Sequence, residues 1–171
     1  MGGTDKAALT IDGCTLLDRA LAAVRGAHSC VVVGPAATTA VPVVREHPPF
    51  SGPAAGLAAG LGALGEGADA VVVLACDLAD ADAAVAALLA AWPPAEDADG
   101  VCLTAGGRSQ WLTAIYRRGP LDAAVARLGD PTGRSVRDLV AGLVLDEVVA
   151  GTAAADIDTW EDLHRARELE S

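Results

Sequence analysis

Aromatic side chains are scarce in this chain of 171 residues: Phe, Trp and Tyr together make up 3% of it, and it has one Met. A core must therefore be built from Ala, Val and Leu. Basic residues are also few, with 12 Lys and Arg against 23 Asp and Glu, for a formal net charge of −11. Because such a surface repels phosphate backbones and anionic lipids, neither nucleic acid nor a membrane is expected as a partner. A nucleotide bound through Mg²⁺ is compatible with this charge, because the metal inverts the local charge.

The chain lacks a Cys-x-x-Cys pair and a His cluster, which excludes the usual zinc patterns. Two of its four cysteines lie in apolar strand-like segments and are expected as small buried residues, and a reduced, cytoplasmic setting is expected. No cationic leader with an apolar segment is visible, and no apolar stretch is long enough to span a bilayer. Residues 1–171 are most simply one folded domain, expected as a monomer or weak homo-oligomer.

One unbroken apolar run, Ala-Val-Val-Val-Leu-Ala-Cys over residues 70–76, ends at Asp77. Apolar runs without alternation are typical of strands that are covered on both faces of a parallel sheet. Ligands of such sheets bind outside the carboxyl ends of the strands, so Asp77 is placed to hold a divalent metal or an amine. A second explanation is equally good on this stretch alone, namely that Asp77 caps the helix that follows.

Short apolar segments and amphipathic segments alternate along the chain. Strands are predicted over residues 30–33, 41–45, 71–77, 101–104, 110–117 and 145–149, and helices over 16–25 and 81–91 and from Pro53, Pro120 and Ser135 onward. Gly106-Gly107 between two strands predicts an antiparallel hairpin. The alternation predicts a layered α/β domain with a mostly parallel sheet and one antiparallel strand.

Glycines mark two further candidate segments. Gly2 and Gly3 precede Lys6, which suggests a flexible backbone that approaches phosphate beside a positive charge, although an N-terminal Gly-Gly is more often a frayed end. Gly52, Gly56 and Gly60 recur every four residues, and Gly inside a helix costs about 0.5–1 kcal/mol relative to Ala. Either tight packing on the sheet or a ligand at the helix N-terminus would explain this bare face.

Two acidic residues near the end of the chain, Asp156 and Asp158, stand at positions i and i+2. In an extended segment their side chains would point the same way and could make a second metal or substrate position. Helix capping is the alternative, and it is favoured for Asp158.

Five segments, taken together and in order, resemble one family, the molybdenum cofactor guanylyltransferases among the MobA-like nucleotidyltransferases. Residues 1–6 are similar to the family's M-G-G-x-D-K signature, 52–57 to G-P-L-A-G, 73–78 to V-L-A-C-D-M/L, 107–112 to G-R-x-Q-x-L, and 156–163 to [ND]-x-[ND]-T-P-E-D-L. The likeness covers nearly the whole chain. It implies a Rossmann-like three-layer fold and Mg²⁺-dependent transfer of GMP from GTP to molybdopterin, with release of pyrophosphate. Molybdoenzymes or other cofactor-biosynthesis proteins would be the protein partners.

The resemblance also implies roles for individual residues. The implied catalytic residues are Lys6 and Asp77; the implied nucleotide contacts are Gly2, Gly3, Lys6, Glu46, His47, Gly52, Gly56 and Asp77; Asp77 and Asp158 would hold Mg²⁺; and Gln110, Trp111, Asp156 and Asp158 would contact the acceptor. The pair Glu46 and His47 is included because a nucleotide-contacting Asp of the family falls at about this place.

The sequence departs from the family pattern at its start. The first strand and the L-A-G-G-x-S-x-R half of the signature loop do not stand before Met1, so we expect a sheet without its central strand. Gly34 and Ala79 also replace residues common in the family, an Asn and a Pro. Three alternatives therefore stay open: cytidylyl transfer to the same cofactor, guanylyl transfer to a phospholactate-like acid, and a non-catalytic nucleotide-binding domain.

Overall fold

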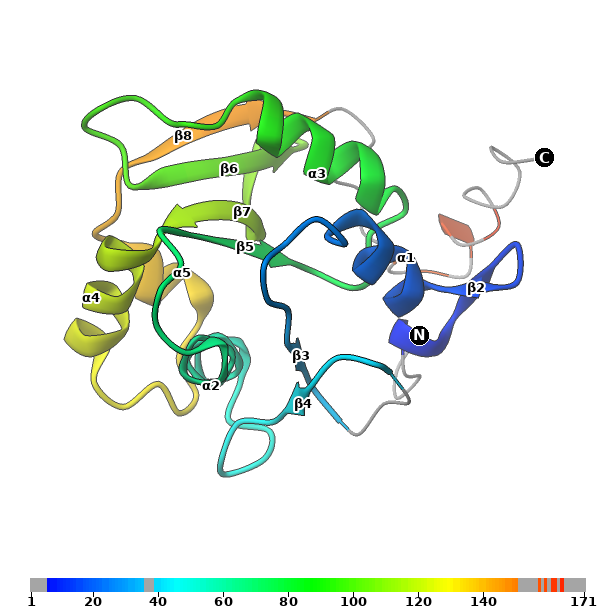
Figure 1. Cartoon of the computed structure of the whole chain (residues 1–171), viewed down its shortest axis with the longest axis horizontal. Helices are drawn as coiled ribbons and strands as arrows, with labels where there is room; N and C mark the ends of the chain where they lie inside the picture. Colours follow the sequence, from blue (N-terminus) through cyan, green and yellow to red (C-terminus); the bar gives the residue numbers. More distant parts are fainter. Residues whose placement is uncertain are drawn as a thin grey trace.

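A four-stranded sheet forms the centre of the molecule (Figure 1). The computed structural model describes residues 6–35, 39–150, 157, 159, 161, 162 and 164. The strand order is β5 (Ala70–Leu74), β7 (Arg108–Arg117), β6 (Gly100–Ala105) and β8 (Leu145–Val149). Strand β7 is antiparallel to both of its neighbours, whereas β6 and β8 are parallel. Three strands therefore share one direction and one opposes them, which confirms the predicted sheet.

The β6–β7 hairpin turns at Gly106 and Gly107, whose φ angles are +56° and +72°. Two-residue turns with positive φ at both positions match the twist of the flanking strands, and glycine adopts such angles without strain. Gly100 is required for another reason, since a Cβ there would lie 2.4 Å from the carbonyl oxygen of Ile115 on β7. The predicted hairpin is thus confirmed, and its first strand has no room for a side chain at its start.

Two further strands form a separate parallel pair, β3 (Val32–Val33) and β4 (Val43–Val44). Both are shorter than the predicted strands. Figure 1 shows this pair beyond β5, on the side away from β7. A third pair, β1 (Thr10–Ile11) and β2 (Cys14–Thr15), is an antiparallel hairpin that turns at Asp12-Gly13. Among the described residues, the expected sheet without a central strand is therefore divided into two sheets, β3–β4 and β5–β7–β6–β8, with no ladder between them.

Five α-helices and one 3₁₀ turn, η1 (Lys6–Ala8), accompany the strands in the described part of the chain. The helices are α1 (Leu16–Ala23), α2 (Pro53–Leu64), α3 (Ala81–Ala90), α4 (Arg118–Leu128) and α5 (Val136–Val140). Thr15 and Ser135 accept hydrogen bonds at the first turns of α1 and α5, as their sequence positions predicted. Helix α4 begins two residues before the predicted Pro120, which still lies in the first turn, where a proline is tolerated.

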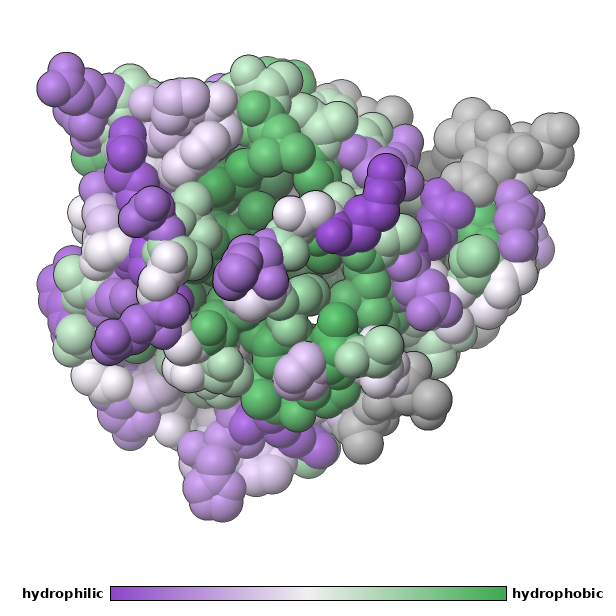
Figure 2. All heavy atoms as spheres, viewed as in Figure 1, coloured by the Kyte–Doolittle hydropathy of each residue, from purple (hydrophilic) through white to green (hydrophobic). Residues whose placement is uncertain are grey.

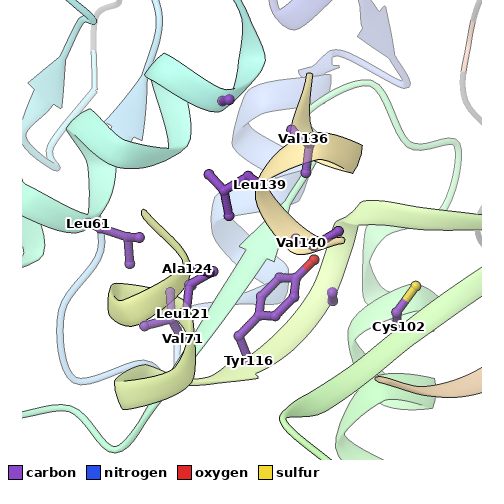
Figure 3. Close-up of a cluster of buried hydrophobic side chains, with 11 residues drawn as sticks. Leu61, Val71, Cys102, Tyr116, Leu121, Ala124, Val136, Leu139 and Val140 are labelled. Atoms are coloured by element: carbon purple, nitrogen blue, oxygen red, sulfur yellow. The ribbon is translucent and has the colours of Figure 1, made fainter. Parts of the chain in front are cut away.

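Side chains of the sheet alternate between two apolar cores. On one face Tyr116 and Val71 pack with α2, α4 and α5. Figure 3 shows the Tyr116 ring reaching between these helices, with its hydroxyl directed toward α5. On the other face Ile115 and Val101 pack with α3. Because successive strand residues point to opposite faces, helices cover both sides, and the predicted three-layer α/β architecture is confirmed. None of the helices in the described residues is long and apolar enough to cross a membrane.

Candidate functional site

A lysine from the start of the chain meets an aspartate that follows the central apolar strand. The Nζ of Lys6 lies 3.0 Å from Oδ2 of Asp77, and the two side chains are 29% and 23% exposed. Lys6 opens η1, which is fixed to the next segment because Leu9 donates its N–H to the Lys6 carbonyl at 3.1 Å. The pair therefore stands in a defined, half-buried place beyond the carboxyl end of β5.

Asp77 does not cap the next helix. That position belongs to Asp80, whose carboxylate accepts the N–H of Ala83 at 2.9 Å at the start of α3. The backbone around Asp77 is held from the C-terminal segment, since Ile157 donates its N–H to the Asp77 carbonyl at 2.8 Å. Ile157 is fully buried beside Ile11 and Leu16. Of the two explanations open for Asp77, capping is thus excluded, and the carboxylate faces Lys6.

A cavity of about 810 Å³ opens next to this pair. Five of the candidate residues line it: Lys6, Glu46, Gly52, Gly56 and Asp77. Most of the remaining lining is apolar, and Figure 2 shows hydrophobic side chains around a hollow in the middle of this face. The charged pair therefore belongs to the lining of a large and mostly apolar cavity. A ligand in this cavity would contact charged groups at Lys6 and Asp77 and apolar side chains elsewhere.

The N-terminus of α2 faces the same cavity. Gly52 is its N-cap with φ +94°, and no side chain caps the helix. Pro53 occupies the first helical position, as predicted. The turn is fixed from outside because Gly133 donates its N–H to the Ser51 carbonyl at 2.7 Å. An N-terminus without a side-chain cap offers N–H groups and a positive dipole end to an anion such as phosphate.

The bare glycine face of α2 packs against β3. A Cβ on Gly60 would lie 2.8 Å from Cγ2 of Val33, and one on Gly56 would lie 3.4 Å from Cγ1. Close helix–strand packing, one of the two explanations considered, therefore accounts for Gly60. Gly56 takes part in this packing and also lines the cavity, so its contact with a nucleotide stays a prediction.

The pair predicted to meet the base or ribose lies in the loop ahead of α2. The Glu46 carboxylate accepts the N–H of Phe50 at 2.8 Å, which closes the loop on itself. His47 is exposed and is not among the residues lining the cavity. Arg45 stacks on the ring of Phe50, with 4.5 Å between the guanidinium carbon and the ring centroid. Glu46 is therefore near the site, whereas His47 would need a ligand that extends beyond the cavity.

One of the two predicted acceptor residues on β7, Trp111, lies by a second pocket, whereas Gln110 is not among the residues that line it. Trp111 lines this pocket of about 370 Å³, together with Ser109, Arg137, Val140, Ala141, Leu143, Leu145 and Glu147. The next residue, Leu112, lines the large cavity instead, so neighbouring residues of β7 line different pockets. Gln110 donates to the carbonyl of Arg108 at 3.4 Å. The sequence motif included Trp111, but Arg137 and Glu147 carried no signal, because they are brought there by α5 and β8.

Four candidate residues, Gly2, Gly3, Asp156 and Asp158, lie outside the described residues. Within the described part of the chain no group of three or more His, Cys, Asp or Glu could hold a metal. Mg²⁺ is commonly bound by one or two carboxylates together with substrate phosphates, not by an all-protein cage. A single half-buried carboxylate such as Asp77 fits an ion of this kind, which arrives with a nucleotide.

The chain resembles known nucleotidyltransferases. A family model described as MobA-like NTP transferase domain matches residues 1–148. Molybdopterin-guanine dinucleotide biosynthesis protein A from Archaeoglobus fulgidus superposes with a TM-score of 0.71 at 18% identity, over 98% of this chain and 91% of that one. A nucleotidyl transferase from Methanothermobacter gives 0.70 at 23%, over 96% and 84%. 2-C-methyl-D-erythritol 4-phosphate cytidylyltransferase from Thermus thermophilus gives 0.67 at 21%, over 96% and 92%. No curated protein matches the chain. At these identities the structural likeness shows a shared fold.

Proposed function

Since the chain belongs to the MobA-like NTP transferase domain family, we propose that it transfers GMP from GTP to molybdopterin and releases pyrophosphate. The chain is a nucleotidyltransferase; the identity of the nucleotide and of the acceptor is the proposed part. The observation that carries the proposal is the pair formed by Lys6 and Asp77 in the lining of the large cavity. The likeness to a molybdopterin-guanine dinucleotide biosynthesis protein supports this nucleotide and acceptor.

In this reaction an oxygen of the acceptor's terminal phosphate forms a bond to the α-phosphorus of the nucleotide. The bond from the α-phosphorus to the oxygen bridging to the β-phosphate breaks, and pyrophosphate leaves with the electron pair. Such transfers depend mainly on positioning the reactants and on stabilising the negative charge. The ammonium group of Lys6 would contact the phosphates, and its ion pair with Asp77 keeps both groups oriented before the nucleotide arrives.

Asp77 would hold Mg²⁺ through its carboxylate, with Asp158 as a proposed second ligand. When bound, the ion neutralises phosphate charge and orients the phosphates. The N-terminus of α2 at Gly52 would receive the remaining anionic part of the nucleotide, and Glu46 would meet the ribose or base. These roles place the nucleotide at the polar end of the large cavity.

The acceptor would bind at the second pocket. Trp111 offers a flat ring on which a pterin can stack, and Arg137 in the same lining offers a positive charge. The backbone at Trp111 is held in place, because its carbonyl accepts the Tyr116 hydroxyl at 2.7 Å. Gln110 and Asp156 are proposed as further contacts. Residues 1–171 would then act as one nucleotidyltransferase domain.

The test is an assay of the full chain with molybdopterin, Mg²⁺ and each of GTP, CTP and ATP, with the product identified by mass spectrometry. We expect a guanine dinucleotide product that depends on GTP and disappears when the divalent metal is chelated. Asp77→Asn and Lys6→Met should abolish it. The proposal would be contradicted if CTP or ATP gave a product and GTP did not. It would also be contradicted if molybdopterin gave no product and another phosphorylated acid did.

A second candidate is cytidylyl transfer. The fold is shared with a cytidylyltransferase at a TM-score of 0.67, so the geometry suits that nucleotide as well. The same assay separates the two, because a cytidylyl enzyme yields product with CTP alone. Calorimetry with Mg²⁺ and GTP, in the absence of acceptor, tests for a non-catalytic nucleotide-binding domain. Such a domain would bind the nucleotide and yield no product in any of the assays.

A further inference from the structure

The second pocket contains two opposite charges that do not pair with each other. Arg137 of α5 and Glu147 of β8 both line it, and both side chains are exposed. Neither forms a salt bridge with any residue in the described part of the chain. Opposite charges that share a small pocket without pairing are available to a ligand that carries hydrogen-bond donors for the one and acceptors for the other.

The carboxylate of Glu147 is held in place by a neighbouring strand. Its Oε1 accepts the hydroxyl of Ser109 at 2.6 Å, and Ser109 lines the same pocket. Ser109 belongs to β7 and Glu147 to β8, so this bond crosses β6, which lies between the two strands in the sheet. A carboxylate has about four lone-pair sites, so the bond from Ser109 leaves most of the acceptor capacity of Glu147 to a ligand.

Strand β7 bulges where it contributes its aromatic residue to the pocket. The register between β6 and β7 shifts between Cys102 and Leu103, and residues 111–113 of β7 have no partner on β6. The carbonyl of Trp111 accepts the hydroxyl of Tyr116 at 2.7 Å. Bulges change the direction of side chains and are common beside active sites. The bulge therefore accounts for an indole in the lining of this pocket, next to the two charged groups.

We propose that the second pocket recognises a flat heterocycle by its 2-amino-4-oxo-pyrimidine edge, and that Glu147 is the residue that selects this edge. The edge carries two neighbouring N–H donors, the amino group and the ring N–H, followed by a carbonyl oxygen. The donors match the carboxylate of Glu147, and the carbonyl matches the guanidinium of Arg137. The ring itself would stack on Trp111. Pterins and guanine share this edge; the inference rests on the proposed function in taking the pterin of the acceptor as the occupant.

The mixed charge of the pocket disfavours other classes of ligand. A phosphate or carboxylate group would be attracted by Arg137 but repelled by Glu147, and a simple cation would meet the reverse. A phospholactate-like acid therefore suits this pocket less well than an uncharged ring with donors and an acceptor on one edge. The volume of about 370 Å³ is near the lower limit of about 300 Å³ for ligand pockets, which suits a single bicyclic ring.

The test measures, by calorimetry near neutral pH and without nucleotide, the binding of two matched rings to the full chain. They are 6-hydroxymethylpterin and 6-hydroxymethyllumazine, in which a carbonyl replaces the 2-amino group. We expect the pterin to bind at least about tenfold more tightly, because the extra carbonyl of the lumazine would face the carboxylate of Glu147. Glu147→Gln keeps the shape of the side chain and supplies an amide donor, so the preference should fall below about twofold or reverse.

Asp146→Asn is the matched control for that variant. Asp146 is the neighbouring acid on β8, but its carboxylate accepts the N–H of Ala95 and it does not line the pocket. The control should keep the preference of the parent protein to within about twofold, since it removes the same charge one residue away without changing the pocket.

Three results would overturn the inference: equal affinity of the parent protein for both rings, a preference that Glu147→Gln leaves unchanged, or no binding of either ring. Guanosine separates the two sources of the edge. If Glu147→Gln weakens guanosine binding more than pterin binding, the pocket takes the base of the nucleotide and the pterin assignment is wrong. None of these measurements needs turnover. The ring preference can therefore hold although no GMP is transferred to molybdopterin, and transfer can proceed although the preference is absent.

Discussion

Lys6 and Asp77 stand 71 residues apart in the chain, and their charged atoms lie 3.0 Å apart in the structure. Both side chains are about a quarter exposed, and ion pairs with this much solvent contribute about 0–1 kcal/mol to stability. Stabilisation of the fold is therefore a weaker explanation of this ion pair than ligand binding. In the proposed function, this lysine and this carboxylate in the cavity lining bind phosphate and its metal.

Asp77→Asn should abolish turnover with little effect on folding. The substitution keeps the shape of the side chain but removes its charge, and losing one such electrostatic contact costs about 100- to 1,000-fold in kcat. The melting temperature should change by less than about 4 °C, because the ion pair contributes at most about 1 kcal/mol. The measurements are steady-state turnover with GTP and a thermal melt.

The matched control for that variant is Asp80→Ala, three residues away. Asp80 caps α3, so its removal should lower the free energy of unfolding by about 1 kcal/mol and leave kcat within about twofold. A reversed pattern, in which Asp77→Asn unfolds the protein while Asp80→Ala inactivates it, would sink the assignment of Asp77.

Two glycines on α2 should respond to alanine in opposite ways. A Cβ on Gly60 meets Val33 at 2.8 Å, whereas one on Gly62 meets nothing within 4 Å. Gly62→Ala should stabilise by up to about 1 kcal/mol through helix propensity. Gly60→Ala should lose that gain and destabilise by about 1 kcal/mol, because the branched Val33 side chain is stiff. Urea unfolding measures both, and Val33→Ala should relieve the effect at Gly60 in a double-mutant cycle.

Stability should fall in alkaline solution because of two buried acids. Burial, assisted by the charge of Glu147, raises the pKa of the Cys102 thiol from 9.0 to about 11. Burial also raises the pKa of Tyr116. Below pH 9 both groups are neutral in the folded and unfolded protein, and their contribution is complete. Between about pH 9 and 11 the Cys102 thiol ionises in the unfolded protein and not in the folded one, so stability is lost by up to about 1.4 kcal/mol per pH unit for that group. Tyr116 adds to this loss from about pH 10 upward, for the same reason.

Urea unfolding from pH 7 to 11 measures this slope. Cys102→Ala should make this slope shallower by the contribution of the thiol. The packing lost in the variant should lower the free energy of unfolding by the same amount at every pH. If the slope of the variant equals that of the parent protein, the thiol ionises equally in both states and the explanation fails.

Trp111→Ala should affect the acceptor and not the nucleotide. If the indole stacks on the acceptor, its loss should raise the KM for the acceptor about tenfold, in line with about 1–1.5 kcal/mol for an aromatic contact. The KM for GTP should stay within about twofold, because Trp111 lines the second pocket and not the large cavity. Leu89→Ala, an exposed apolar residue on α3, is the control and should change neither. A common rise of both KM values would refute two separate pockets.

Local features of the fold were predictable because they depend on neighbours in the sequence. Thr15 and Ser135 are capping residues, and α1 and α5 begin directly after them. Gly106-Gly107 forms the turn of a hairpin between two apolar segments. The lengths of the strands were harder to predict from the sequence. The strand predicted over residues 30–33 is reduced to Val32–Val33, because its second edge has no partner among the described residues and a strand is stabilised by pairing on both sides.

The amino-acid sequence alone was enough to predict most helices and strands in their order, the apolar run that ends at Asp77, and the caps at Thr15 and Ser135, since each follows from residues a few positions apart. The tertiary structure alone decided that Asp80, not Asp77, caps α3, that Gly60 is bare because Val33 packs on it, and that Trp111 faces a pocket of its own. Such contacts join segments distant in sequence. Their geometry depends on how the layers pack, and no local pattern records it.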